Sequence, residues 1–321
     1  MGKMRLQILS RDDIKRIHNA SIKVLETIGA QFLNHKALDY LEKYGCTIDR
    51  KRMTAKIPEA VVNEFMKKAL PEIPYVNRDL KPIPRQEIHF ATFDQGTYLT
   101  ERDGTSHPST CKDVEKVLIV GNSLDAVDIP NGAVAARDIN PETAGLHTTL
   151  ITWNTLSNPK KALPGYGGRD GKTMKVIIEM ASVLAGGIEQ LRKTPFITGG
   201  VCPTSPLVWP GPGLDSMMIA AENGMATWTI GMATSGSMAP MSLAGTMVVH
   251  NAEMLSFETF SQLVAYDAGW NGIAGKMGCS SSVLDVRKGY YPVGNPEMAL
   301  LNAAAAELAQ YYQCPNVSAG A

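Results

Sequence analysis

The sequence lacks an excess of charge of either sign and lacks long apolar runs. Its 321 residues carry 31 lysines and arginines against 31 aspartates and glutamates, with no long block of like charge. Because phosphate backbones are bound by clustered positive charge, this balance argues against a nucleic-acid partner. The most apolar stretch, residues 243–257, is interrupted by His250, Asn251 and Glu253. A simple membrane span is therefore not expected.

Cysteine is scarce and scattered. Five cysteines stand at positions 46, 111, 202, 279 and 314, and none forms a C-x-x-C pair. An odd, dispersed set does not make a disulfide framework. The first 13 residues also lack the apolar core of a signal peptide. Together these absences predict a reducing, cytoplasmic location.

Hydrophobic residues make up 44% of the chain, enough for a sizeable core. The first 70 residues have apolar positions at helical spacing, and Ser10 with Asp13 resembles a capping box at a helix start. A proline-rich connector follows at 70–86. Residues 87–109 are rich in Thr, Tyr and Phe and contain D-Q-G and D-G turn signals, which predict a β-hairpin. Residues 1–109 are thus predicted to be a helical segment plus a hairpin.

From Thr110, a predicted helix cap, strand-like and helix-like stretches alternate. The predicted strands are 128–135, 161–168, 195–202, 225–232, 271–278 and 315–321, and the predicted helices lie near 142–158, 170–186, 213–223, 241–265 and 295–312. Regular β–α alternation predicts a parallel sheet covered by helices, which is an α/β fold.

The sheet is predicted to be part of a (β/α)8 TIM-type barrel and not a doubly wound open sheet. The strands are rich in glycine, and the chain has no nucleotide fingerprint: "GYGGRDG" at 165–171 has Asp170 where the last glycine should stand. Residues 110–321 supply about six strands of eight, so the barrel is predicted to be incomplete at its C-terminus. Catalytic groups of such barrels lie at the carboxyl ends of the strands.

Three segments follow predicted strands and provide candidate pocket residues. In the proline-rich segment 202–213 the candidates are Thr204, Ser205 and Trp209. Trp209 either offers a π face to a cationic ligand or packs in the core.

The second segment, 231–253, is rich in small residues, and Pro240 opens a helix. The N–H groups at that helix start suit a carboxylate or a developing negative charge, whereas the alternative is close helix–strand packing. Glu253 is predicted to be a buried, hydrogen-bonded acid or an interface residue. The candidates here are Ser235, Ser237, Met238 and Ser242.

The third segment, 276–297, contains Cys279, Ser280, Asp285 and Tyr290. Asp285 is expected to pair with Arg287 and so to position the loop, and Tyr290 is a candidate for lining an amine pocket. Cys279 has no histidine partner in sequence, so a buried thiol is favoured over a nucleophile. The six histidines show no metal-ligand spacing, and no metal is predicted.

Four stretches together resemble the trimethylamine:corrinoid methyltransferase family. They are "LSRDDIKRIHNASIKVLETIGAQF" (9–32), "YLTERDGTSHPSTCKDVEKV" (98–117), "GSMAPMSLAGTMVVHNAEMLSFETF" (236–260) and "DVRKGYYPVGNPEMALLNAAAAELAQYY" (285–312). The similarity runs over essentially the whole chain, and the S-x-A-P-x-S-L-A-G element followed by N-A-E is its most specific part.

The resemblance implies a (β/α)8 barrel with N-terminal additions. It implies methyl transfer from a methylated amine to the cobalt of a corrinoid carried by a separate partner protein, with no tightly bound cofactor, and a homo-oligomer at full length. In the trimethylamine branch an amber codon is decoded as pyrrolysine at the end of a segment similar to "PNVSAGA". The expectation is therefore a pyrrolysine directly after Ala321, with Gly320 and Ala321 at the pocket.

Three alternatives stay open. The first is a pyrrolysine-free relative acting on a quaternary amine such as glycine betaine, whose nitrogen already carries the charge. The second is a non-catalytic amine-binding module. The third, an unrelated aldolase-type barrel, requires a lysine at a strand end, for which Lys276 is the candidate.

Overall fold

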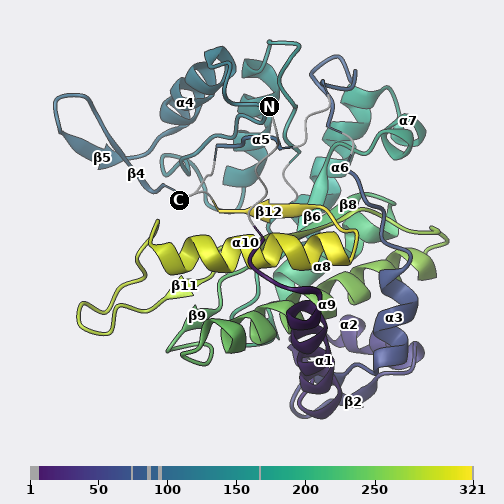
Figure 1. The fold of residues 1–321 in the computed structure, drawn as a ribbon. Helices are drawn as coiled ribbons and strands as arrows, with labels where there is room; N and C mark the ends of the chain where they lie inside the picture. The colour runs from purple at the N-terminus through teal and green to yellow at the C-terminus, as the bar shows by residue number, and fades with distance from the viewer. Residues whose placement is uncertain (1–6, 74, 85–87, 93–95, 166–167, 320–321) are drawn as a thin grey trace, which may run out of the picture. The chain divides into compact units, whose positions relative to one another are not determined.

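The computed structural model describes residues 7–73, 75–84, 88–92, 96–165 and 168–319, coloured along the chain in Figure 1. The chain forms two compact units. The sheet unit comprises residues 1–72 and 199–321, and the helical unit comprises residues 73–198. The boundary expected at 109/110 on sequence grounds lies inside the helical unit and stays a prediction.

The main sheet is parallel, with strand order β12-β10-β8-β6. β8 pairs with β10 from Thr227–Gly275 to Gly231–Cys279. Helices join the strands in sequence, which confirms the α/β class and four of the predicted strands, while closure into a barrel stays a prediction. The elements are β6 (Thr198–Gly200), α8 (Gly211–Glu222), β8 (Ala226–Gly231), α9 (Leu243–Asp267), β10 (Gly275–Cys279), α10 (Pro296–Tyr311) and β12 (Asn316–Ser318).

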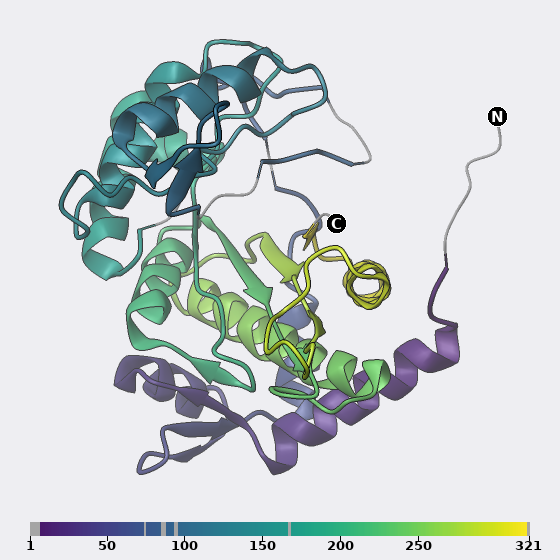
Figure 2. The same ribbon diagram turned by 90° about the vertical axis from the view of Figure 1, so that its left-hand side faces the viewer.

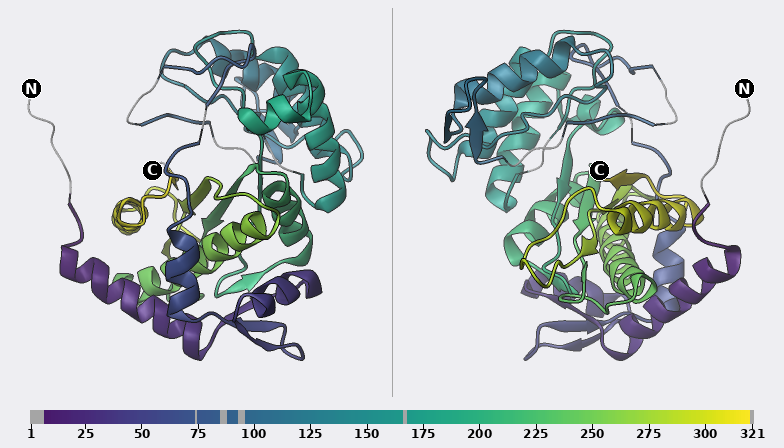
Figure 3. Two further views of the ribbon diagram at one scale, coloured as in Figure 1. Left: turned by 90° about the vertical axis from the view of Figure 1, so that its right-hand side faces the viewer. Right: turned by 60° about the vertical axis from the view of Figure 1, so that its left-hand side comes forward.

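Helix α9 is the centre of the sheet unit. It begins at the cap Ser242, whose side chain accepts a hydrogen bond from the Gly245 N–H, and it is buried without interruption from His250 to Ala265. The helix lies between the strands β8 and β10 and the N-terminal helices α1 and α3 (Figures 2 and 3). Burial on all sides explains why α9 has apolar residues around its whole circumference. No helix within the described residues, α9 included, is long and apolar enough to cross a membrane.

The N-terminal part of the sheet unit combines helices with a small sheet. The predicted capping box is confirmed: Asp13 donates its backbone N–H to Ser10 Oγ and accepts the Ser10 N–H. The prediction of a purely helical segment was incomplete, because three short strands form here and join β7 in the order β2-β3-β1-β7. The elements are α1 (Arg11–Thr27), β1 (Ala30–Phe32), α2 (His35–Lys43), β2 (Thr47–Asp49), β3 (Thr54–Lys56), α3 (Glu59–Met66) and β7 (Val208–Trp209).

The helical unit contains the predicted hairpin, in which Tyr98 lies opposite Pro108 and Thr100 opposite Ser106. Thr110 caps α4, as predicted, and Asp113 is its reciprocal partner. The elements are β4 (Tyr98–Thr100), β5 (Ser106–Pro108), α4 (Cys111–Ser123), α5 (Ala144–Thr155), α6 (Gly171–Ala185) and α7 (Ile188–Lys193).

Two predicted strands of the helical unit were wrong. In 128–135 only Ile129 and Val134 form isolated bridges, and among the described residues of 161–168 only Gly165 does. Proline interrupts both segments, at Pro130 and Pro164, and a proline has no N–H for a strand ladder.

Candidate functional site

The carboxyl ends of the strands in the sheet unit meet at one edge, because the strands are parallel. Beyond this edge the chain forms a short parallel extension, in which β9 (Thr234–Ser235) pairs with β11 (Ser282–Val283). Two of the three predicted pocket segments are thereby placed side by side. Ligands of parallel α/β proteins bind at this edge, which makes it the candidate site.

The hydroxyl groups of the segment between β8 and α9 mostly form hydrogen bonds within the segment itself. Ser235 is fully buried, and its Oγ lies 2.6 Å from Thr246 Oγ1, which in turn donates to the Pro240 carbonyl at 2.9 Å. Ser242 is used as the α9 cap. Ser237 and Met238, in the turn between them, are exposed, and so is Ser242, so a ligand can reach these three candidates.

The side chains at the end of β10 are buried. Cys279 is fully buried, and burial raises the pKa of its thiol to about 11, so it stays protonated at neutral pH. This agrees with the predicted buried thiol. Ser280 is buried, and its Oγ lies 3.3 Å from Tyr291 Oη.

The loop between β11 and α10 is organised by Asp285. Its carboxylate accepts the backbone N–H groups of Arg287 and Lys288, at 3.0 and 3.1 Å. The expected contact between Asp285 and Arg287 therefore uses the backbone of Arg287. Tyr290 accepts the Asp285 N–H with its carbonyl and is 46% exposed, and Lys288 Nζ lies over its ring, 5.9 Å from the centroid.

Of the two alternatives for Trp209, the structure shows packing in the core, so Trp209 is wrong as a pocket candidate that offers its ring to a cationic ligand. Trp209 is fully buried, and its ring centroid lies 6.5 Å from that of Phe32 and 5.3 Å from that of Phe257. Its Nε1 donates to Ser256 Oγ at 3.1 Å. The reason is the pairing of β7 with β1, which turns this part of the segment into the core. The neighbouring Thr204 is exposed and Ser205 half-buried.

Two buried residues of α9 lie behind the candidate site. Glu253 accepts a hydrogen bond from Ser205 Oγ at 3.1 Å and another from the Leu207 N–H at 2.9 Å. Burial raises the pKa of Glu253 to about 7 despite these two bonds. The predicted buried, hydrogen-bonded acid is thus confirmed.

His250, one helical turn before Glu253, packs against the end of β8. A Cβ atom at Gly231 would lie 2.7 Å from His250 Nδ1, so this strand end requires glycine. Burial lowers the pKa of His250 to about 4 and keeps the ring neutral. Sequence reasoning gave His250 no place at the site. The available signal was a histidine three residues before a glutamate in an otherwise apolar helix.

Gly320 and Ala321 lie outside the described residues, and the pyrrolysine expected after them stays a prediction.

A family model described as "Trimethylamine methyltransferase (MTTB)" matches residues 2–321. The chain belongs to the trimethylamine methyltransferase family.

Curated relatives in this family align over nearly the whole chain. Trimethylamine methyltransferase MttB of Desulfitobacterium hafniense (strain DSM 10664 / DCB-2) is 29% identical over 315 residues, which cover 97% of this chain and 62% of the relative. MttB of Methanosarcina barkeri (strain Fusaro / DSM 804) is 31% identical over 330 residues, covering 100% of this chain and 65% of the relative. The chain therefore spans somewhat less than two thirds of the length of these relatives.

A glycine betaine methyltransferase of Desulfitobacterium hafniense (strain Y51) is 27% identical over 326 residues, covering 100% of this chain and 66% of the relative. Among solved structures, one described as "Crystal structure of the hydroxylamine MtmB complex" superposes with a TM-score of 0.44 and 13% identity, covering 97% of this chain and 80% of that chain.

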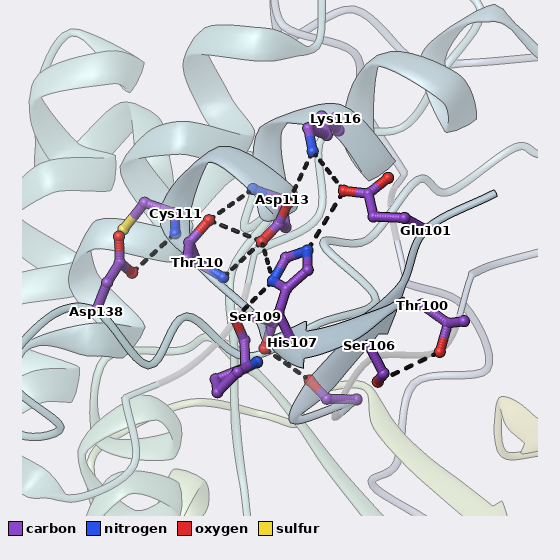
Figure 4. Close-up of polar contacts among 12 residues, drawn as sticks. Thr100, Glu101, Ser106, His107, Ser109, Thr110, Cys111, Asp113, Lys116 and Asp138 are labelled. Atoms are coloured by element: carbon purple, nitrogen blue, oxygen red, sulfur yellow. Dashed lines mark hydrogen bonds and ion pairs between the residues drawn. The ribbon is translucent and has the colours of Figure 1, made fainter. Parts of the chain in front are cut away.

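This family member also brings metal-ligand atoms together in its helical unit. Ligand atoms of Glu101, His107 and Asp113 lie within 4.8 Å of one another (Figure 4). Lys116 Nζ lies 3.1 Å from an oxygen of each carboxylate, so an ammonium group already stands between them. Hydrogen bonds from Thr110 and Lys116 lower the pKa of Asp113 to about 2. The cluster fits a clamp between the hairpin and α4 better than an open ion site.

Proposed function

We propose that the protein containing this chain transfers a methyl group from trimethylamine to the Co(I) corrinoid of a separate corrinoid protein, in methanogenesis from methylamines. The observation that carries the proposal is the family match over residues 2–321, together with relatives named trimethylamine methyltransferases at about 30% identity. We further propose a cytoplasmic location, which the five free cysteines support.

The reaction is a nucleophilic displacement at carbon. The carbon–nitrogen bond of trimethylammonium breaks, its electron pair stays on nitrogen as dimethylamine, and the two electrons of Co(I) form the methyl–Co(III) bond. Catalysis of such a step rests on orienting the methyl group and on supporting positive charge at nitrogen. In this chain the exposed groups at the carboxyl edge, Thr204, Ser237 and Tyr290, are proposed to orient the amine. The family resemblance assigns the activation of the amine nitrogen to the predicted pyrrolysine.

Glycine betaine is the second candidate substrate, because one relative is a glycine betaine methyltransferase. The full-length protein should be mixed with a reduced corrinoid protein and each amine in turn. We expect the methyl–Co(III) absorbance to develop with trimethylamine. If the methyl–Co(III) absorbance develops with glycine betaine alone, glycine betaine replaces trimethylamine as the proposed substrate. If the absorbance does not change with either amine, the non-catalytic binding module is favoured.

A further inference from the structure

We propose that Glu253 is the positioning residue for the loop 204–208, which follows β6 at the carboxyl edge of the sheet. The inference rests on the proposed function, because it assigns this loop to the substrate-facing edge. Glu253 belongs to α9 and not to the loop, so it holds the loop from a rigid neighbouring element.

The loop is a closed structure with the Glu253 contacts inside it. Thr204 and Val208 exchange backbone hydrogen bonds in both directions, at 2.8 and 3.2 Å. Both donors to Glu253, the Ser205 hydroxyl and the Leu207 N–H, lie between these two residues. A single buried carboxylate therefore fixes the interior of the loop at two points, while Thr204 remains exposed at the edge.

Leu207 shows why the loop needs such a holder. Its φ is +62°, in the left-handed region that a leucine adopts only when its surroundings hold it there. The Leu207 carbonyl accepts the Gln31 N–H at 2.8 Å, and its N–H is donated to Glu253. Backbone conformations of this kind concentrate at functional sites.

The charge of Glu253 also reaches the end of β10, which β8 separates from β6 in the sheet. Burial first, and the Glu253 carboxylate to a smaller extent, raise the pKa of Cys279 at the end of β10. Glu253 thus acts on the strand ends of both β6 and β10, which flank β8 in the sheet.

Glu258 provides a matched control on the same helix. It is as fully buried as Glu253, but its Oε1 accepts from Gln262 of α9 itself, at 2.7 Å. A Cβ atom at Gly275 would lie 1.7 Å from Glu258 Oε2, which places Glu258 against the beginning of β10, at the opposite edge of the sheet. Loss of Glu258 should weaken the fold without moving the loop.

The test uses the full-length protein and two measurements: amide hydrogen exchange of residues 204–208, and kcat and KM for trimethylamine with a reduced corrinoid protein. In Glu253→Ala we expect exchange to become at least tenfold faster and kcat/KM to fall at least tenfold. Glu253→Gln keeps an acceptor for Leu207 and should stay within threefold of the natural protein. Glu258→Ala, assayed where it is folded, should also stay within threefold.

If Glu253→Ala does not fold, Glu253→Asp, whose carboxylate is one methylene shorter, carries the same expectation of faster exchange. Unchanged exchange, or an equal loss of kcat/KM in Glu258→Ala, would overturn the inference. A tenfold loss of kcat/KM in Glu253→Gln, with unchanged amide hydrogen exchange of residues 204–208, would overturn the inference in favour of direct chemistry by the carboxylate. An inactive natural protein would defeat the proposed function, whereas the exchange measurement would still decide the role of Glu253.

Discussion

The sheet unit and the helical unit order their chain in different ways. In the sheet unit, strands pair over several residues and α9 fills the space behind them with buried side chains. In the helical unit, segments between helices are fastened one contact at a time. Thr92 Oγ1 and the Asn131 backbone exchange hydrogen bonds at 2.9 and 2.6 Å, and the buried Lys161 donates to the Leu124 and Val127 carbonyls. Periodic patterns of hydrophobic residues in the sequence indicate the strands and helices of the sheet unit. They do not indicate the isolated contacts that fasten the helical unit.

Removing one tryptophan from each unit should change stability more than any other substitution considered for this comparison. Trp209→Ala should lower the free energy of unfolding by about 3–5 kcal/mol, because the side chain is fully buried. Trp153→Ala should cost about 1 kcal/mol less, because among the described residues Trp153 contacts one aromatic ring, Phe196, where Trp209 contacts two. Urea denaturation measures both losses. Equal losses would remove the proposed difference in packing.

The second effect concerns the pH dependence of the sheet unit. Burial raises the pKa of Glu258 to about 7, so the folded state favours the neutral acid. Its contribution to stability is complete below about 4.5 and is lost as pH rises through about 7. Glu258→Gln removes this dependence. Its stability relative to the natural protein should therefore rise by about 3 kcal/mol between pH 4.5 and pH 8, at about 1.4 kcal/mol per pKa unit.

The quantity to measure is the difference in the free energy of unfolding between Glu258→Gln and the natural protein. Burial of His250 makes stability change with pH in the opposite direction, but this contribution is the same in both proteins and cancels in the difference. A difference that stays constant over this pH range would show that Glu258 is ionised in the folded protein.

The smallest effect tests the clamp in the helical unit. The Pro108 carbonyl first, and the Glu101 carboxylate next, raise the pKa of His107 above its ordinary value. Glu101→Gln should move the pKa of His107 downward in an NMR titration, and Glu115→Gln, at an exposed position of α4, should leave it in place. An unmoved His107 pKa in Glu101→Gln would remove Glu101 from the clamp.

Helix caps, strands and helices were predictable from the sequence where the residues of one segment are enough to determine them. The capping box at Ser10, the helix cap at Thr110 and the alternation of the four main-sheet strands with helices depend on residues close together in the chain. The buried state of Glu253 was also predictable, because a glutamate in the middle of an apolar helix needs partners.

Long-range pairing was not predictable. Trp209 is buried because β7 joins β1, almost 180 residues earlier in the chain, and nothing in the segment 202–213 signals that partner. The Glu101, His107, Asp113 and Lys116 cluster likewise depends on a hairpin lying against a helix start. The predicted hairpin and the predicted helix cap at Thr110 were the local signals of that cluster.

The proposed methyl transfer from trimethylamine to cobalt can be followed by isotope labelling. Trimethylamine labelled with ¹³C in its methyl groups is incubated with the full-length protein and a reduced corrinoid protein, and the products are followed by NMR. We expect one labelled methyl group on cobalt for each dimethylamine formed. Dimethylamine without labelled methyl–cobalt, or no labelled product of either kind, would show that the protein does not transfer a methyl group from trimethylamine to cobalt.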